Sequence, residues 1–105
     1  MKEIEYKITK FMLAHECPAH YMGYQYLKDG IALLPNQERE TNNMRSMVYE
    51  KVADRYSTGV TNVERCLRVL ADHWWQRNKC GGLFPARPTN SEMVYVCAEH
   101  VKKPS

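Results

Sequence analysis

Three charged side chains that could recognise nucleic-acid bases lie within two turns of one predicted helix. They are Glu64, Arg65 and Arg68, in the stretch VTNVERCLRVLADHWW at residues 60–75. An arginine can donate two parallel hydrogen bonds to O6 and N7 of guanine, and a glutamate can accept a hydrogen bond from N4 of cytosine. The same pattern is also typical of a solvated helix face, where Glu64 and Arg68 would form an i,i+4 ion pair worth about 0.2–0.5 kcal/mol. The residue types alone leave both interpretations open.

The helix that carries these side chains has the spacing of the second helix of a helix-turn-helix. Val52 and Ala53 precede Val63, which follows the alanine by ten residues. A small residue is needed where the first helix crosses the second, and an apolar residue fills the angle between them. The short connection contains Gly59. In this geometry the second helix presents its early exposed residues to the major groove of DNA.

The start of that second helix carries further candidates for contacts with DNA. Thr58, Thr61 and Asn62 have side chains that suit phosphate oxygens, and the positive end of the helix dipole favours the same contacts. Thr58 is also predicted to cap the helix. Thr61 and Glu64 are predicted to form a capping box one turn later.

Helical periodicity extends over the rest of the chain, and no segment shows strand-like alternation over a useful length. The apolar stripes are Ile4, Ile8, Phe11, Met12 and His15; Tyr24, Leu27, Ile31 and Leu34; Met44, Val48, Val52 and Tyr56; Val63, Leu67, Leu70 and Trp74; and Val94, Cys97, Ala98 and Val101. Residues 36–43 are predicted to form a polar loop, residues 78–88 an irregular connection and residues 89–92 a capping box. The sequence therefore predicts one all-α domain over residues 1–105, a compact bundle of five or six helices with a helix-turn-helix at about residues 45–77.

The composition fits a small soluble protein of the cytoplasm. The 105 residues are too few for two domains with separate cores, and a net charge of +3 permits an anionic partner without requiring one. The longest apolar run, residues 93–98, is too short to span a membrane, and the first residues do not form a secretory signal. The four cysteines contain no CxxC pair, which indicates free thiols in a reducing compartment.

Sequence motifs of catalytic and cofactor sites are absent. There is no GxSxG, HExxH, phosphate-binding glycine loop or dinucleotide fingerprint, so we expect no enzyme activity, no cofactor and no small-molecule substrate. The cluster of His15, Cys17 and His20, with Cys97 and His100 repeating the Cys-x-x-His spacing, suggests a zinc site as an alternative. Neither pair has the doubled motif typical of zinc proteins, so no metal is predicted.

Three blocks of the sequence carry a resemblance to a known family. They are PAHYMGYQYLKDGI at residues 18–31, VYEKVADRYSTGVTNVERCLRVLADHWWQR at residues 48–77 and RPTNSEM at residues 87–93. In this order they resemble the C-terminal DNA-binding effector domain of the master sporulation response regulator of endospore-forming bacteria. The resemblance implies an all-helical domain that binds short asymmetric boxes of double-stranded DNA, often as a head-to-tail pair, and acts as a transcription factor.

The resemblance also implies roles for individual residues. Glu64, Arg65 and Arg68 correspond to the family's base-reading residues, and His20 corresponds to a residue that contacts the DNA backbone. A homodimer on tandem sites and RNA polymerase are the further partners that we expect. The family's tryptophan matches Trp75, whereas the apolar stripe selects Trp74, whose role stays open.

Several positions depart from the family pattern. Asn62 stands where a basic residue is common and Met22 replaces a lysine, so we expect weaker binding with a flatter salt dependence. Gly30 replaces a helix-favouring alanine, which would destabilise the helix by about 1 kcal/mol if this residue lies mid-helix. The connection at residues 78–88 is shorter than in the family.

The family normally carries a receiver domain ahead of this one, whereas Met1 lies almost at the start of the effector domain, so a stand-alone effector is expected. The alternative is a protein-interaction module that keeps the fold and antagonises a full-length regulator without productive DNA binding.

Overall fold

The protein, seen in a computed structural model, is described over residues 2–34 and 43–103. Its elements are α1 Lys2–Ala14, α2 Met22–Leu33, the π-helix η1 Arg45–Tyr49, α3 Glu50–Arg55, α4 Val60–Asn78, the 3-10 helix η2 Lys79–Gly82 and α5 Asn90–Lys102. These residues contain no strand, so the predicted all-α class is confirmed. Of the loop predicted at residues 36–43, all but Asn43 lies outside the described residues.

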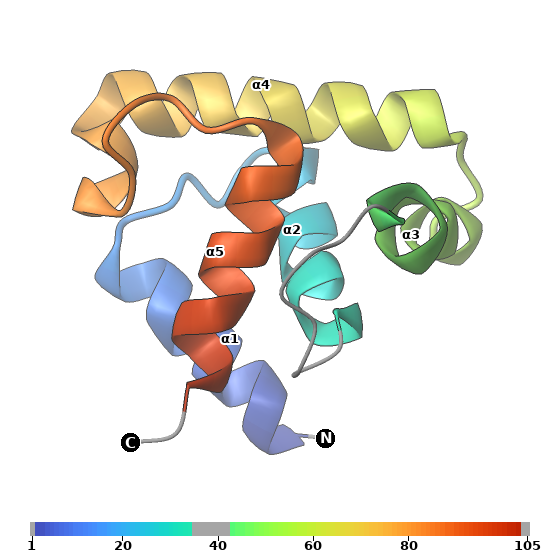
Figure 1. The fold of residues 1–105 in the computed structure, drawn as a ribbon, viewed down its shortest axis with the longest axis horizontal. Helices are drawn as coiled ribbons and strands as arrows, with labels where there is room; N and C mark the ends of the chain where they lie inside the picture. The colour runs from blue at the N-terminus through green and yellow to red at the C-terminus, as the bar shows by residue number, and fades with distance from the viewer. Residues whose placement is uncertain (1, 35–42, 104–105) are drawn as a thin grey trace.

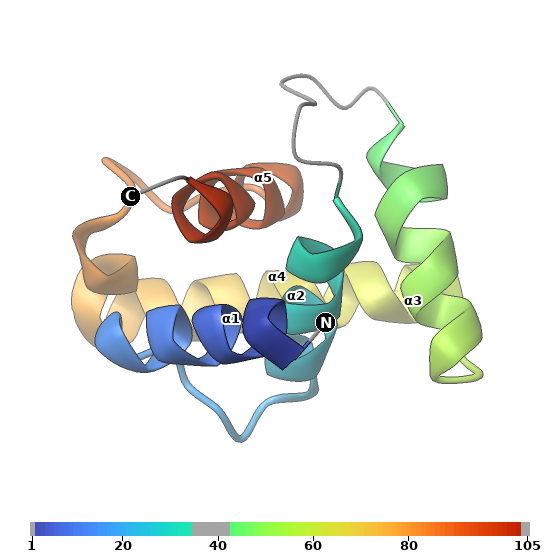
Figure 2. The same ribbon diagram turned by 90° about the horizontal axis from the view of Figure 1, so that it is seen from below.

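The longest helix, α4, lies along one side of the molecule and the other helices pack beneath it (Figure 1). α2 packs against α4 and also contacts α1 and α5. α3 stands at the end where α4 begins, apart from α1 and α5 (Figure 2). The first turn of α1 and the last turn of α5 lie on the side opposite to α4 (Figure 1). One outer face of α4 is therefore left for contacts with other molecules.

The buried face of α4 is the apolar stripe that the sequence predicts. Val63, Leu67, Leu70 and Trp74 are between 0% and 1% exposed, which confirms the stripe. The stripes predicted for α2 and α5 are also buried, at residues Tyr24, Leu27, Ile31, Leu34, Val94, Cys97, Ala98 and Val101. Trp75 is half-buried, and Nζ of Lys79 lies 5.0 Å from the centroid of its ring. Trp74 is thus the tryptophan of the core.

α2 crosses α4 so closely that the contact requires glycine at position 23. A Cβ atom on Gly23 would lie 2.4 Å from the carbonyl oxygen of Cys66 and 2.9 Å from Cβ of Leu70. At Gly30 the atom nearest to an added Cβ would be Cγ1 of Val48, at 3.0 Å. Glycine at this position therefore leaves room for a valine from the π-helix.

The start of α4 differs from the prediction. Ser57 has φ 54°, in the left-handed region, and the amide N–H of Thr58 donates to the carbonyl oxygen of Ala53 at 2.9 Å. Gly59 is then extended (φ −94°, ψ 158°) and precedes the helix without a side-chain cap. The predicted cap by Thr58 is therefore wrong. The predicted capping box of Thr61 and Glu64 is also wrong, because Gly59 occupies the N-cap position and Thr61 already lies in the first turn of α4.

The connection after α4 is irregular, as predicted. Lys79, Cys80 and Gly81 have φ between 55° and 62°, and the N–H of Gly81 donates to Oδ1 of Asn78 at 2.8 Å. A Cβ atom on Gly81 would lie 2.8 Å from Cβ of His15. The indole Nε1 of the core tryptophan donates to the carbonyl oxygen of His15 at 3.1 Å. The turn after α1 thus fits into the turn after α4, and both attach to the core.

Candidate nucleic-acid interface

α3 and α4 form the helix-turn-helix that the spacing predicts. Ala53 is 4% exposed and Val63 is fully buried where the two helices meet. Figure 1 shows α3 nearly end-on while α4 runs across the view. The hydroxyl of Tyr56, in the turn, donates to Oδ2 of Asp29 on α2 at 2.5 Å, and the guanidinium of Arg55 lies 3.9 Å from the same oxygen. Burial, followed by this hydrogen bond, raises the pKa of Tyr56 to about 12. The turn is therefore fixed to α2.

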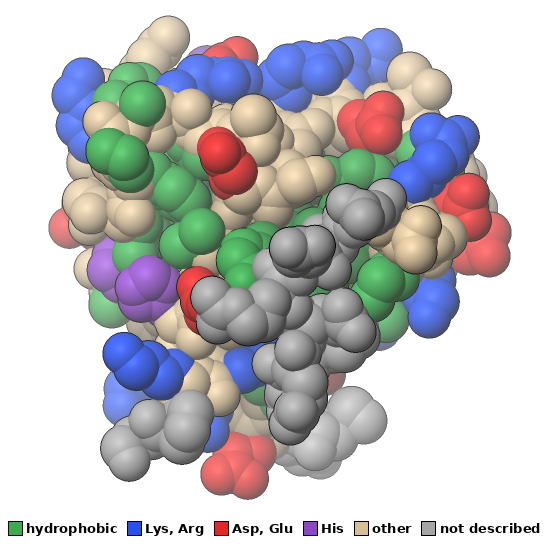
Figure 3. Space-filling model, in the orientation of Figure 1, with side chains coloured by type: hydrophobic (Ala, Val, Ile, Leu, Met, Phe, Trp, Pro, Cys, Tyr) green, Lys and Arg blue, Asp and Glu red, His purple; other side chains and the backbone are tan. Residues whose placement is uncertain are grey.

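The three candidate base-reading residues lie on the side of α4 that faces away from the core. Arg65 and Arg68 are exposed and Glu64 is half-buried. Among the residues that the structure describes, no ion pair joins Glu64 to Arg68. Lys and Arg side chains follow the outer edge of the molecule over α4 (Figure 3). Both arginines thus present their guanidinium groups to solvent on the outer face of the second helix.

Asn62 links the turn to one of these arginines. Its Nδ2 donates to Oγ1 of Thr58 at 3.0 Å, and its Oδ1 accepts from a guanidinium N–H of Arg65 at 2.9 Å. Thr58 and Asn62 were expected to contact phosphates. In the free protein they bond to each other and orient Arg65, while Thr61 is exposed.

The N-terminus of α5 contacts the same part of α4. The predicted capping box is confirmed, because the N–H of Thr89 donates to Oε1 of Glu92 at 2.9 Å and the N–H of Glu92 donates to Oγ1 of Thr89 at 3.2 Å. Nδ2 of Asn90 donates to the carbonyl oxygen of Glu64 at 2.8 Å. Sequence reasoning missed this contact, since a bond across 26 residues leaves no periodic signal. Asn90 thus fixes the backbone beneath a candidate base-reading residue.

One acidic residue also lies near the exposed face of α4. Asp72 follows Arg68 by four residues and forms an ion pair with Nε of Arg87, from the connection before α5. Unpaired, this carboxylate would repel DNA phosphates. The ion pair offsets its charge and assigns a role to an arginine that the sequence pattern did not explain.

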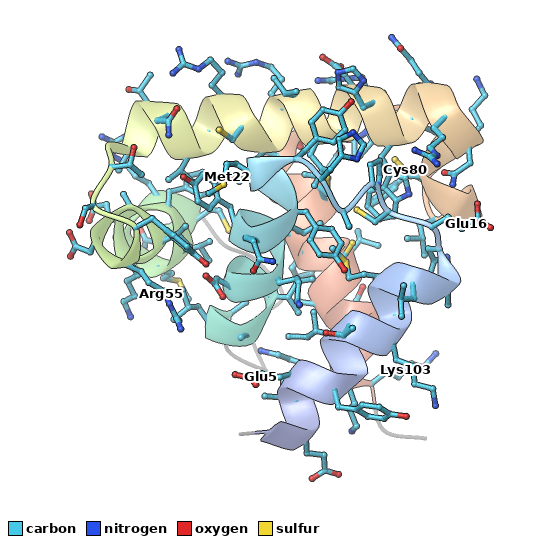
Figure 4. All side chains as sticks on the ribbon, turned by 180° about the vertical axis from the view of Figure 1, so that it is seen from behind. Glu5, Glu16, Met22, Arg55, Cys80 and Lys103 are labelled. Carbon is cyan, nitrogen blue, oxygen red and sulfur yellow. The ribbon has the colours of Figure 1, made fainter. Side chains whose placement is uncertain are left out.

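His20 lies beside the second half of α4, not at its start. Its ring centroid is 4.3 Å from that of Tyr21, and the Tyr21 ring stacks on His73 of α4 at 4.6 Å and 20°. His73 follows Arg68 by five residues. Figure 4 shows the chain entering α2 at Met22, close to α4. The structure therefore places His20 on the flank of the helix, away from Thr58, Thr61 and Asn62.

The alternative zinc site is not assembled. Within residues 2–34 and 43–103, no group of three or more His, Cys, Asp or Glu side chains could hold a metal ion. Cys17 and Cys97 are buried, and desolvation raises the pKa of both thiols, whereas His20 is exposed and Nδ1 of His100 lies 3.0 Å from the carbonyl oxygen of Val96. All four cysteines are free.

None of the helices described here is both long and apolar enough to cross a membrane.

A comparison with family models matches residues 8–101 to the family described as "Sporulation initiation factor Spo0A C terminal". The match covers nearly the whole chain and includes the helix-turn-helix. The family comprises DNA-binding effector domains of transcription regulators and is not a family of enzymes. The chain belongs to the family of the C-terminal domain of the sporulation initiation factor Spo0A.

Proposed function

We propose that this protein regulates transcription by reading a short asymmetric DNA box with the first half of α4 in the major groove. The observation that carries the proposal is the exposure of Arg65 and Arg68 on a helix whose opposite face is fully buried in a helix-turn-helix. A rigid helix with exposed guanidinium groups suits bidentate hydrogen bonds to guanine.

Each residue near this face has a role in the proposal. Arg65 and Arg68 donate to guanine O6 and N7, and Glu64 accepts from cytosine N4. Thr61 and His20 contact backbone phosphates on either flank. Thr58 and Asn62, also considered for phosphate contacts, serve to orient Arg65 through their hydrogen bonds.

Stable binding by so small a module is best explained by two copies on adjacent sites. One recognition helix buries limited surface, and a second copy adds its contacts to those of the first. We place this activity in the bacterial cytoplasm, with RNA polymerase as the partner that would convert binding into regulation.

The test begins by selecting bound duplexes from random DNA, followed by titration of Arg65→Ala and Arg68→Ala on the selected duplex and on an unrelated one. Each variant should lose about 1–3 kcal/mol of binding free energy on the selected duplex and little on the unrelated one. Lys10→Ala is the matched control, because it removes one charge from α1, which packs against α2 and α5. Equal losses of binding free energy on both duplexes would show that Arg65 and Arg68 do not read bases. No binding at low salt would favour the interaction module.

A further inference from the structure

An open hollow lies on the flank of α4, beyond the candidate base-reading residues. It has a volume of about 260 Å³ and is lined by Pro18, Tyr21, His73, Gln76 and Arg77. Tyr21 comes from the turn before α2, and the last three residues come from the second half of α4. Because the Tyr21 ring stacks on the His73 ring at 4.6 Å, the two walls of the hollow are in contact.

The lining has the chemistry of an anion site. Arg77 carries a permanent positive charge, and its planar guanidinium can donate two hydrogen bonds to one phosphate. The ring of His73 and the side-chain amide of Gln76 supply further N–H donors. No carboxylate lines the hollow, and no ion pair among the described residues occupies Arg77. An anion would therefore meet donors and one charge of opposite sign.

The hollow lies at a suitable distance from the base-reading residues. An α-helix rises about 1.5 Å per residue, so His73 lies about 12 Å and Arg77 about 18 Å along α4 from Arg65. The major groove is about 12 Å wide. A helix whose first turns enter the groove therefore brings residues this far along it to the sugar–phosphate backbone at the edge of the groove and just beyond it.

We propose that the hollow binds one backbone phosphate of the DNA that flanks the box, with Arg77 as the charged ligand and His73 and Gln76 as additional donors. This inference rests on the proposed DNA binding. The contact is independent of base identity, so it adds affinity and fixes the orientation of α4 without contributing sequence preference. It supplies a phosphate contact in a protein that lacks a basic side chain at Asn62 and Met22.

The experiment compares the parent protein with Arg77→Gln on the selected duplex and on an unrelated duplex over a salt series. One phosphate contact contributes about 0.9 to the slope of log affinity against log salt. The ratio of the parent's affinity to that of Arg77→Gln should therefore fall about 3.5-fold between about 50 and 200 mM salt, equally on both duplexes. In a second series, single phosphates of the selected duplex are replaced by uncharged methylphosphonates. The parent should lose affinity at one flanking position where Arg77→Gln loses none.

Lys10→Gln is the matched control, because it makes the same change in charge on α1 and should leave the salt slope unchanged. Equal slopes for the parent and Arg77→Gln, or an equal change in Lys10→Gln, would overturn the inference while leaving the proposed function intact. A methylphosphonate effect of the same size in the parent and in Arg77→Gln would also overturn it. A parent protein that binds neither duplex would overturn the proposed function itself.

Discussion

Replacing Gly23 with alanine perturbs a close contact between α2 and α4. The added Cβ would lie 2.4 Å from the carbonyl oxygen of Cys66 and 2.9 Å from Cβ of Leu70, and neither atom can move without its helix. Overpacking of this kind destabilises by about 1–3 kcal/mol, and a required backbone shift places it at the upper end. Alanine recovers about 1 kcal/mol of helix propensity. We therefore expect the free energy of unfolding to fall by about 2 kcal/mol.

The assay is urea and thermal denaturation followed by circular dichroism. For a chain of this length, a loss of that size should lower Tm by roughly 8–16 °C and lower the urea midpoint at an unchanged slope. Gly30→Ala is the control, because its nearest contact is the Cγ1 methyl of Val48 at 3.0 Å, which can rotate away. Its stability should stay within about 1 kcal/mol of the parent. The reasoning is refuted if Gly23→Ala is as stable as the parent, or if Gly30→Ala loses as much.

Three further predictions concern other contacts. Asn62→Ala removes the acceptor that orients Arg65, so binding to the selected duplex should weaken about two- to fivefold in a titration, with no loss on unrelated DNA; equal losses on both would contradict it. Tyr56→Phe removes the donor to Asp29 and should lower the free energy of unfolding by about 1.5 kcal/mol in urea at pH 7. Because the folded pKa of Tyr56 is raised to about 12, this difference should be complete below the ordinary tyrosine pKa and disappear as the pH rises through the folded value; a constant difference would argue against it. Burial raises the pKa of Cys80 to about 11, so a thiol reagent at pH 8 should modify it only after unfolding, and mass spectrometry of native protein would reveal any exception.

Periodicity predicted the parts of the fold that depend on burial. The stripe that ends at Trp74 lies in the core because one face of each helix must exclude water. Apolar residues therefore recur with the helical period, which can be read from the sequence. The positions of Ala53 and Val63 likewise follow from the close crossing of two helices, so the helix-turn-helix could be predicted.

Contacts made by single side chains could not be predicted in the same way. A serine with positive φ is uncommon, so local preferences favoured a cap at Thr58, whereas Ser57 turns the chain one step earlier and Gly59 precedes the helix. The stack of Tyr21 on His73 depends on how α2 meets α4, which no local pattern contains. The arrangement of side chains on the flank of α4 could therefore be found only from the structure.

The positions of Glu5 and Lys103, on the side of the molecule opposite to α4, set the reach of anything joined to the chain (Figure 4). That side and α4 lie at opposite ends of an axis along which the molecule extends 30 Å (Figure 1). A polypeptide attached at either end would need at least about nine extended residues before it could pass to the side that carries α4. Immobilising the protein on a sensor surface through either end therefore leaves α4 directed toward the solution.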